Sequence, residues 1–240
     1  MKTLENEEVH IAVANNKGGA AKTLTVINLA QAFTNEGKRV VVIDGDKNRT
    51  CKNWAIRRGS QEPFPVITIM ESFKYSKPKD IVLYDTAGGI ADDEIKDLIK
   101  ACEYLVVPCT ADVPNMEASE NMAKFFLENN INFRILISDA MSAGNFARAR
   151  MLFNYFQEQR IPTFKQIIPR SAKMVDAGDQ GKTIGNISGA RFIADKFTEV
   201  ALQILEDVAN KQPSSLNAKD INLMNKDIDN SKRQVEKIGA

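Results

Sequence analysis

The sequence predicts an α/β fold with a doubly wound, mostly parallel sheet that carries helices on both faces. Three observations support this class. Of the 240 residues, 43% are hydrophobic and 26% are charged, which is typical of a globular domain. Short apolar runs recur along the chain and alternate with stretches of helical periodicity. These runs are nearly continuous, as in strands of a parallel sheet that is covered on both faces.

The predicted elements follow in order from the N-terminus. A strand at 10–14 leads through a glycine-bearing turn into a helix over 22–36, and a second strand covers 38–44. Further apolar runs predict strands at 66–70, 81–85, 104–108, 133–138 and 164–169. Because the connections are short throughout, we expect residues 1–210 to form one domain.

Residues 211–240 differ in composition, since they are polar and contain Pro213-Ser214-Ser215. Apolar residues nevertheless fall there on a heptad-like stripe: Ile221, Met224, Ile228, Val235 and Ile238. We expect a polar tail with a short amphipathic helix that packs on its own domain or on a partner subunit. A membrane anchor is disfavoured, because the opposite face of the stripe is mixed in charge.

Composition excludes several classes of protein. Lys and Arg number 32 against 31 Asp and Glu, so the chain as a whole is not a polybasic binder of nucleic acid or membranes. No apolar run approaches the length of a spanning helix, and the first residues lack the apolar core of a secretory signal, which predicts a cytoplasmic protein. Three cysteines without CxxC spacing argue against a disulfide framework or a zinc site.

A phosphate-binding loop is predicted between the first strand and the first helix. It reads Asn15-Asn16-Lys17-Gly18-Gly19-Ala20-Ala21-Lys22-Thr23. Such a turn points successive backbone N–H groups at a phosphate, and the helix N-terminus adds its positive dipole end. Lys22 is expected to neutralise the β- and γ-phosphates, and the Thr23 hydroxyl to ligate Mg²⁺. The usual pattern is G-x-x-x-x-G-K-[ST], and here Asn16 and Ala21 stand at the two glycine positions.

The segment from Lys17 to Thr23 resembles the deviant Walker A motif of the ParA/MinD family of P-loop ATPases. The resemblance covers about residues 9–205 and implies a P-loop NTPase fold, with ATP and Mg²⁺ as cofactors. In that family the first lysine, here Lys17, reaches across a nucleotide-sandwich dimer to the phosphates of the other subunit, which implies an ATP-dependent homodimer. The loop residues implied to bind nucleotide are Lys17, Gly18, Gly19, Ala20, Ala21, Lys22, Thr23 and Leu24.

Carboxylates follow two of the predicted strands. Asp44-Gly45-Asp46 ends the second strand and resembles the D-x-D segment of the family, and Asp85 ends the fourth and resembles its Walker B segment. Ligands bind at the carboxyl ends of parallel strands, so we expect Asp44, Asp46 and Asp85 to converge on Mg²⁺ and the γ-phosphate. The resemblance implies that Asp46 orients the attacking water and that Asp85 holds Mg²⁺ through its water shell. The catalytic residues are then Lys17, Lys22 and Asp46, and the metal site is Thr23, Asp46 and Asp85.

Ala21 and Leu24 depart from the family pattern, which usually has Gly and then Ser or Thr at these positions. Ala21 is compatible with the loop if its φ is negative. Leu24 lacks a hydroxyl for the α-phosphate. Both substitutions therefore bear on the rate of hydrolysis.

A basic segment follows in the second half of the chain, where residues 141–200 carry 9 basic and 5 acidic side chains. Residues 166–184 resemble the ParA segment that builds part of the adenine pocket, which implies roles for Pro169 and Arg170. Clustered Lys and Arg neutralise phosphates without reading bases. The candidate DNA-binding residues are Arg148, Arg150, Arg170, Lys173, Arg191 and Lys196.

The segment from Asp44 to Trp54 is also similar to VirC-type ATPases of DNA transfer.

The leading hypothesis is a ParA-type ATPase that dimerises on Mg·ATP, binds DNA non-specifically and is reset by hydrolysis. Its implied partners are a second copy, DNA and a ParB-like or other cargo-adaptor protein that stimulates a slow intrinsic activity. Such a switch serves plasmid or chromosome partition or cargo positioning, in the cytoplasm and on the nucleoid in the ATP state. Two alternatives remain: a MinD-like membrane-associated positioning ATPase, and a nearly inert ATP-dependent clamp.

Overall fold

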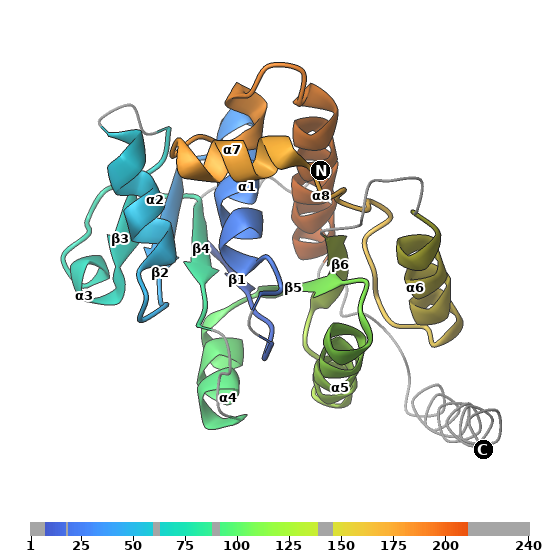
Figure 1. Ribbon diagram of the computed structural model, residues 1–240. Coiled ribbons are helices and arrows are strands. Elements are labelled where there is room, and N and C mark those ends of the chain that lie inside the picture. Colours follow the sequence, from blue (N-terminus) through green and yellow to red (C-terminus); the bar gives the residue numbers. More distant parts are fainter. Residues whose placement is uncertain (1–7, 18, 60–62, 88–91, 139–145, 211–240) are drawn as a thin grey trace.

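Six parallel strands form a single sheet in the computed structural model, which describes residues 8–17, 19–59, 63–87, 92–138 and 146–210. The strand order is β3-β2-β4-β1-β5-β6, and every neighbouring pair is parallel. The strands are β1 (Val9–Val13), β2 (Val40–Asp44), β3 (Val66–Thr68), β4 (Ile81–Asp85), β5 (Tyr104–Thr110) and β6 (Phe133–Ser138). The predicted doubly wound, parallel α/β fold is therefore confirmed (Figure 1).

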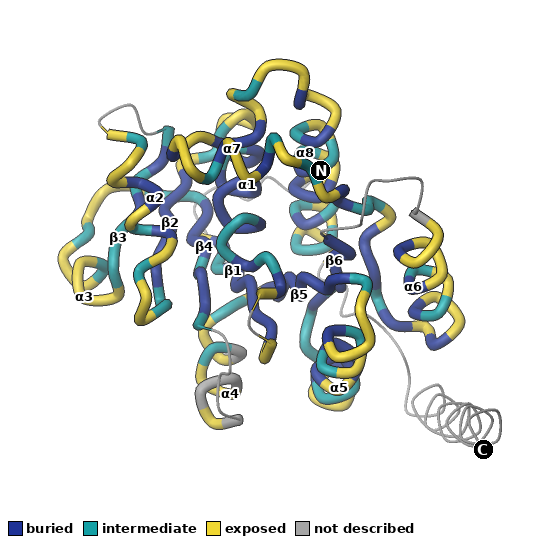
Figure 2. Tube along the Cα trace, in the orientation of Figure 1, coloured by how far each residue is buried: buried dark blue, intermediate teal, exposed yellow. Residues whose placement is uncertain are grey.

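Helices cover both faces of this sheet. They are α1 (Lys22–Asn35), α2 (Thr50–Arg58), α3 (Ile69–Ser72), α4 (Asp92–Ala101), α5 (Val113–Glu128), α6 (Phe146–Glu158), α7 (Ala172–Asp179), the 3₁₀ turn η1 (Ile184–Asn186) and α8 (Arg191–Ala209). Along β1, Ile11 and Val13 pack into a cluster with α1, α2 and α8, whereas Ala12 and the following Ala14 pack with α5 and α6. This alternation buries the strands on both faces, as the dark blue trace in Figure 2 shows.

The register of the central strands aligns their carboxyl ends. Val13 at the end of β1 lies beside Asp85 at the end of β4, and Asp85 lies beside Asp44 at the end of β2. The loop that joins β1 to α1 leaves from the same edge. The fold therefore brings the predicted loop and both strand-end carboxylates to one place, as expected for a parallel sheet.

The predicted strand at 66–70 is too long. Strand β3 ends at Thr68, and Ile69 and Met70 begin helix α3 with exposed fractions of 49% and 72%. The cause is a capping box: the Thr68 hydroxyl accepts the Glu71 N–H, while the Glu71 carboxylate accepts the Thr68 N–H. This reciprocal pair starts a helix where the apolar run alone predicts more strand.

The predicted strand at 164–169 is wrong. The segment runs beside β6 and makes one isolated bridge, between Thr163 and Ile135. The Phe164 N–H donates to the Ile135 carbonyl, and the Ile168 N–H donates to the Ile137 carbonyl. Four residues of the segment therefore span the length of two residues of β6, so regular strand pairing cannot continue. The run is apolar because Phe164 and Ile168 are fully buried in the cluster with α1 and α8.

Helix α8 is anchored near its C-terminus by a polar network. The Arg134 guanidinium donates to both oxygens of Asp207 at 2.7 and 3.0 Å, and the Tyr104 hydroxyl donates to Asp207 at 2.6 Å. The network ties α8 to β5 and β6. The predicted tail of 211–240 lies outside the described residues.

Among the described residues, no helix combines the length and apolarity needed to cross a bilayer. None of the three cysteines, all of which the structure describes, forms a disulfide; Cys51 and Cys109 are buried and Cys102 is half-buried.

Candidate functional site

The loop between β1 and α1 is closed by a buried lysine. Lys22, the first residue of α1, is 8% exposed, and its ammonium donates to the carbonyls of Asn15 at 3.2 Å and Lys17 at 3.1 Å. Burial lowers the pKa of Lys22, whereas the charges of Asp85 and Asp46 act to raise it. The loop therefore wraps around a cation that lies within electrostatic reach of two carboxylates.

Ala21 adopts a left-handed backbone conformation, with φ 59° and ψ 28°. The condition under which Ala21 is compatible with the loop, a negative φ, is therefore not met. The Ala21 carbonyl accepts the Thr25 N–H at 3.0 Å and the Thr25 hydroxyl at 2.9 Å, so the left-handed turn directs the chain into α1. Alanine in this conformation costs about 1–2 kcal/mol, which glycine avoids.

Thr23 and Asp85 form a hydrogen-bonded pair across the site. The Thr23 hydroxyl donates to Asp85 Oδ2 at 2.7 Å, and Asp85 is 1% exposed. Asp85 Oδ1 is buried and has no hydrogen-bond partner among the described residues. Burial raises the pKa of Asp85 to about 7, with further raising by the charges of Asp44 and Asp46 and opposition from the Thr23 hydrogen bond. A hydroxyl beside an unsatisfied carboxylate oxygen suits a hard cation such as Mg²⁺.

The two carboxylates of the 44–46 segment differ in role. Asp44 is fully buried, and its oxygens accept the N–H groups of Asp46 at 3.0 Å and Lys52 at 2.8 Å. It therefore shapes the turn, and it does not line the cleft described below. Asp46 is half-buried, accepts the Asn48 N–H at 2.9 Å and lines the cleft described below.

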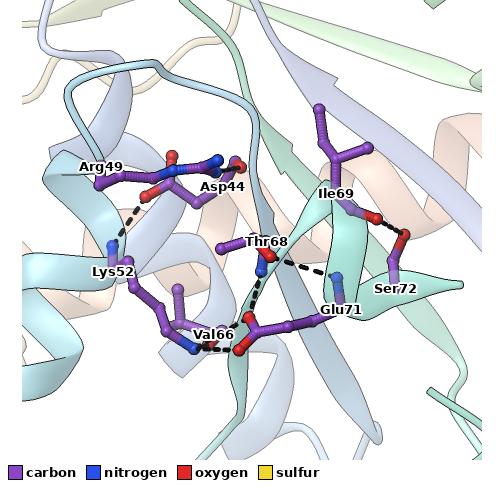
Figure 3. A network of polar contacts seen from close by, with 8 residues as sticks. All are labelled: Asp44, Arg49, Lys52, Val66, Thr68, Ile69, Glu71 and Ser72. Carbon is purple, nitrogen blue, oxygen red and sulfur yellow. Dashed lines mark hydrogen bonds and ion pairs between the residues drawn. The ribbon is translucent and has the colours of Figure 1, made fainter. Parts of the chain in front are cut away.

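A network behind Asp44 fixes this turn (Figure 3). The Arg49 guanidinium donates to the Asp44 carbonyl at 3.0 Å. The Lys52 ammonium donates to the Val66 carbonyl at 2.9 Å and pairs with the Glu71 carboxylate at 3.1 Å. The network joins the start of α2 to the end of β3 and to α3, so the loop that carries Asp46 is held at both ends.

The loop at the start of α1 lines one open cleft of about 1540 Å³ together with Asp46 and Asp85. Of the predicted site residues, it is lined by Gly19, Ala20, Ala21, Lys22, Thr23, Leu24, Asp46 and Asp85. The described residues include no cluster of three or more His, Cys, Asp or Glu placed to hold a metal ion. Mg²⁺ usually takes few protein ligands and keeps several waters, and the Thr23 hydroxyl and Asp85 carboxylate fit that preference.

Lys17, Pro169 and Arg170 do not join this set. The Lys17 side chain is exposed, Pro169 is buried and Arg170 is exposed, and none of the three lines the cleft in the described structure. Gly18 lies outside the described residues. Burial acts to raise the pKa of Asp112, which precedes α5. Hydrogen bonds from Thr110 and Asn115 and the charge of Lys17 outweigh this effect, so the pKa of Asp112 is lowered.

The candidate DNA-binding residues divide between two places. Arg170 and Lys173 flank the N-cap of α7, and the Lys173 ammonium donates at 2.8 Å to the Ser188 carbonyl in the turn before Arg191. Arg191 is exposed and pairs with Asp195 at 3.8 Å, while Lys196 is half-buried. Arg148 and Arg150 are exposed on α6, a different helix (Figure 1). The Lys173–Ser188 contact brings the start of α7 beside the turn that leads into α8.

Asn15 is a site residue to which the motif gave no role. Its side chain is fully buried, and its Oδ1 accepts the Lys17 N–H at 2.8 Å. Its Nδ2 donates to the Pro108 carbonyl at 2.7 Å and to Ser119 Oγ at 3.2 Å. The signal in the sequence is an amide directly after an apolar strand, because a buried amide requires partners.

Comparison with known proteins agrees with this geometry. Residues 11–236 match the family model described as the CobQ/CobB/MinD/ParA nucleotide binding domain. The chain is 26% identical over 166 residues to the maintenance of carboxysome distribution protein A of Gloeobacter kilaueensis, which covers 66% of this chain and 75% of that protein. It is 24% identical over 137 residues to protein virC1 of Rhizobium radiobacter, which covers 52% of this chain and 59% of that protein.

Solved structures share the fold. The MinC:MinD cell division protein complex of Aquifex aeolicus aligns with a TM-score of 0.65 and 15% identity, over 82% of this chain and 96% of that chain. Cobyrinic acid a,c-diamide synthase of Mycobacterium smegmatis, with a bound ATP analogue and magnesium, aligns with a TM-score of 0.59 and 16% identity, over 86% of this chain and 98% of that chain.

Proposed function

Because the chain belongs to the CobQ/CobB/MinD/ParA nucleotide binding domain family, we propose that it is a ParA-type ATPase that binds and hydrolyses Mg·ATP in the cleft around Lys22. One observation carries the proposal. A buried lysine at a helix N-terminus and a Thr23–Asp85 pair meet at the carboxyl edge of a parallel sheet. This arrangement provides for a polyphosphate and its metal ion.

Each residue has a distinct task in this proposal. The backbone N–H groups at the start of α1 and the Lys22 ammonium hold the β- and γ-phosphates, while Thr23 and Asp85 hold Mg²⁺, Asp85 through its water shell. The bound cation neutralises charge that develops on the phosphates. Asp46 faces the same cleft from a fixed turn and orients the attacking water. Pro169 and Arg170 contribute to the adenine site.

The position of Lys17 supports the proposed dimerisation. Its side chain is exposed and lies outside the cleft of its own chain, whereas Lys22 is buried within that cleft. In the proposed ATP-bound homodimer, Lys17 supplies a second cation to the nucleotide of the partner copy. Such a contribution in trans makes hydrolysis depend on assembly and keeps the isolated chain slow.

The dimer binds DNA without sequence preference through the basic residues of α7 and the start of α8. A ParB-like or cargo-adaptor protein stimulates ATP hydrolysis, which releases the protein from DNA. The relative named for carboxysome distribution supports a role in positioning cargo, and nucleoid association in the ATP state follows from DNA binding. A nearly inert ATP-dependent clamp is the second candidate, because Leu24 lines the cleft with an apolar side chain where the family usually has a hydroxyl.

The test is DNA binding by gel shift at two salt concentrations, without nucleotide, with ADP and with ATP plus Mg²⁺. We expect binding only with Mg·ATP, with a steep loss at the higher salt concentration and no dependence on DNA sequence. Lys22→Ala is the control and is expected to abolish it. Absence of DNA binding in every state would refute the DNA switch, and sedimentation with liposomes would then test the MinD-like alternative.

A second test addresses hydrolysis. Asp46→Ala is expected to leave Mg·ATP binding intact and to trap the dimer, as measured by ATP turnover together with size-exclusion chromatography. Unimpaired turnover would remove Asp46 from the mechanism. Negligible turnover of the unaltered chain with its stimulating partner would favour the clamp.

A further inference from the structure

We propose, on the basis of the nucleotide site proposed above, that Ser119 on α5 is a positioning residue that holds the phosphate loop through Asn15. The two side chains are in direct contact, with Asn15 Nδ2 donating to Ser119 Oγ at 3.2 Å. Both residues are fully buried, at 0% exposed. Ser119 does not line the cleft, and its contact with Asn15 links it to the loop.

The Asn15 side chain connects α5 and β5 to the loop backbone. Its amide nitrogen is fixed by two acceptors, Ser119 Oγ and the Pro108 carbonyl, which orients the amide plane. Its oxygen then accepts the Lys17 N–H at 2.8 Å. The orientation set by Ser119 therefore determines where the Lys17 peptide unit lies.

The Lys17 carbonyl, which belongs to the next peptide group along the chain, contacts the cation of the site. The Lys17 carbonyl accepts from the Lys22 ammonium at 3.1 Å, and the Asn15 carbonyl accepts from the same ammonium at 3.2 Å. A continuous path of hydrogen bonds thus runs from Ser119 through Asn15 and Lys17 to Lys22. Removal of the hydroxyl leaves a buried amide N–H without one partner, and such groups reorient or admit water.

The test uses Ser119→Ala with a matched control, Thr163→Val. Thr163 is also buried, and its hydroxyl donates to the Ile161 carbonyl away from the loop. Each variant therefore removes one buried hydroxyl, and that of Ser119 accepts from Asn15 and also bonds Cys109. Titration with a fluorescent ATP analogue and Mg²⁺ is expected to show a Kd that rises about three- to tenfold in Ser119→Ala and less than about twofold in the control. An unchanged Kd in Ser119→Ala, with binding lost in Lys22→Ala, would overturn the positioning role alone.

A double-mutant cycle tests whether Ser119 acts through Asn15. If it does, Ser119→Ala has no further effect on the Kd once Asn15→Ala is present, because the connecting amide is gone. Additive effects of the two substitutions would overturn the proposed path.

Hydrogen exchange of the Lys17 amide gives a readout that needs no nucleotide. We expect exchange about tenfold faster in Ser119→Ala than in Thr163→Val, with unchanged protection of the β5 amides. Equal exchange at Lys17 in the two variants would overturn the inference even if the chain binds ATP. If the unaltered chain binds no nucleotide, the proposed function fails, and this exchange rate still decides the positioning role.

Discussion

Asp85→Asn should stabilise the protein in the absence of metal, and the gain should depend on pH. Asn is nearly isosteric with Asp, and its carbonyl oxygen can still accept the Thr23 hydroxyl that bonds Asp85 Oδ2. The substitution removes a charge that is 1% exposed and lies near Asp44 and Asp46, while the opposing charge of Lys22 has the smallest effect on its pKa.

The magnitude follows from the pKa of about 7, against the ordinary value of 3.8. Above pH 7 the carboxylate is charged in the folded and the unfolded chain, and folding carries the full cost of burying it. As the pH falls below 7, the folded chain takes up a proton that the unfolded chain does not bind, so stability rises. The cost is at most about 4 kcal/mol at pH 8 and falls to about 1.5 kcal/mol at pH 5.

The assay is urea denaturation of both proteins between pH 5 and 8.5 with EDTA, followed by circular dichroism and by the fluorescence of Trp54. Trp54 is the single tryptophan and is buried, so its emission reports unfolding. The free energy of unfolding of Asp85→Asn should exceed that of the unaltered protein by about 2–4 kcal/mol at pH 8 and by less at pH 5. With Mg·ATP the order should reverse, since the proposed metal ligand is missing. A gap that does not change with pH, or a less stable variant at pH 8, would refute the reasoning.

Three further predictions concern stability and are checked by the same denaturation at one pH. Ala21→Gly should stabilise the chain by about 1 kcal/mol, because φ is 59° there; destabilisation would contradict the strain. Gly181→Ala should lower the free energy of unfolding more than Gly37→Ala, although both glycines have positive φ. A Cβ at Gly181 would lie 2.4 Å from a backbone nitrogen of α2, whereas a Cβ at Gly37 meets nothing within 4 Å. Equal losses of stability would argue against this clash. Asp207→Ala should cost about 2–4 kcal/mol, because it strips two donors of their shared acceptor, whereas Asp195→Ala on the same helix removes only an exposed 3.8 Å pair and should cost less than about 0.5 kcal/mol; similar costs would show that the buried network adds little.

The sequence predicts the fold class and the site edge well because both depend on local patterns. Buried parallel strands read as apolar runs, and the ends of β2 and β4 carry Asp44 and Asp85 at equivalent positions. The prediction of a strand at 164–169 is wrong although it rests on the same apolar pattern that identifies the true strands. An apolar run reports burial, and Phe164 is buried by helices while its backbone leaves the register of β6.

Within the site, residue type was predictable but conformation was not. The spacing predicts that Lys22, Thr23 and Asp85 lie close together, and in the structure they line one cleft. The positive φ of Ala21 goes against the preference of an L-residue, and it is set by the turn into α1. The contact of Asn15 with Ser119 joins residues far apart in the chain, which no local pattern specifies.

The all-parallel sheet also has a consequence for how the chain folds as it leaves the ribosome. Among the described strands, β1 pairs with β4 and β5 alone, with Val9 beside Ile81 and Ile11 beside Tyr104, and neither pairing is a hairpin. At synthesis rates of about 5–20 residues per second, β4 follows β1 by roughly 4 to 14 s. During that interval an apolar strand and the loop that follows it have no sheet to join. The nascent chain therefore depends on protection from aggregation until β4 has emerged, and the nucleotide site forms only after most of the sheet has been made.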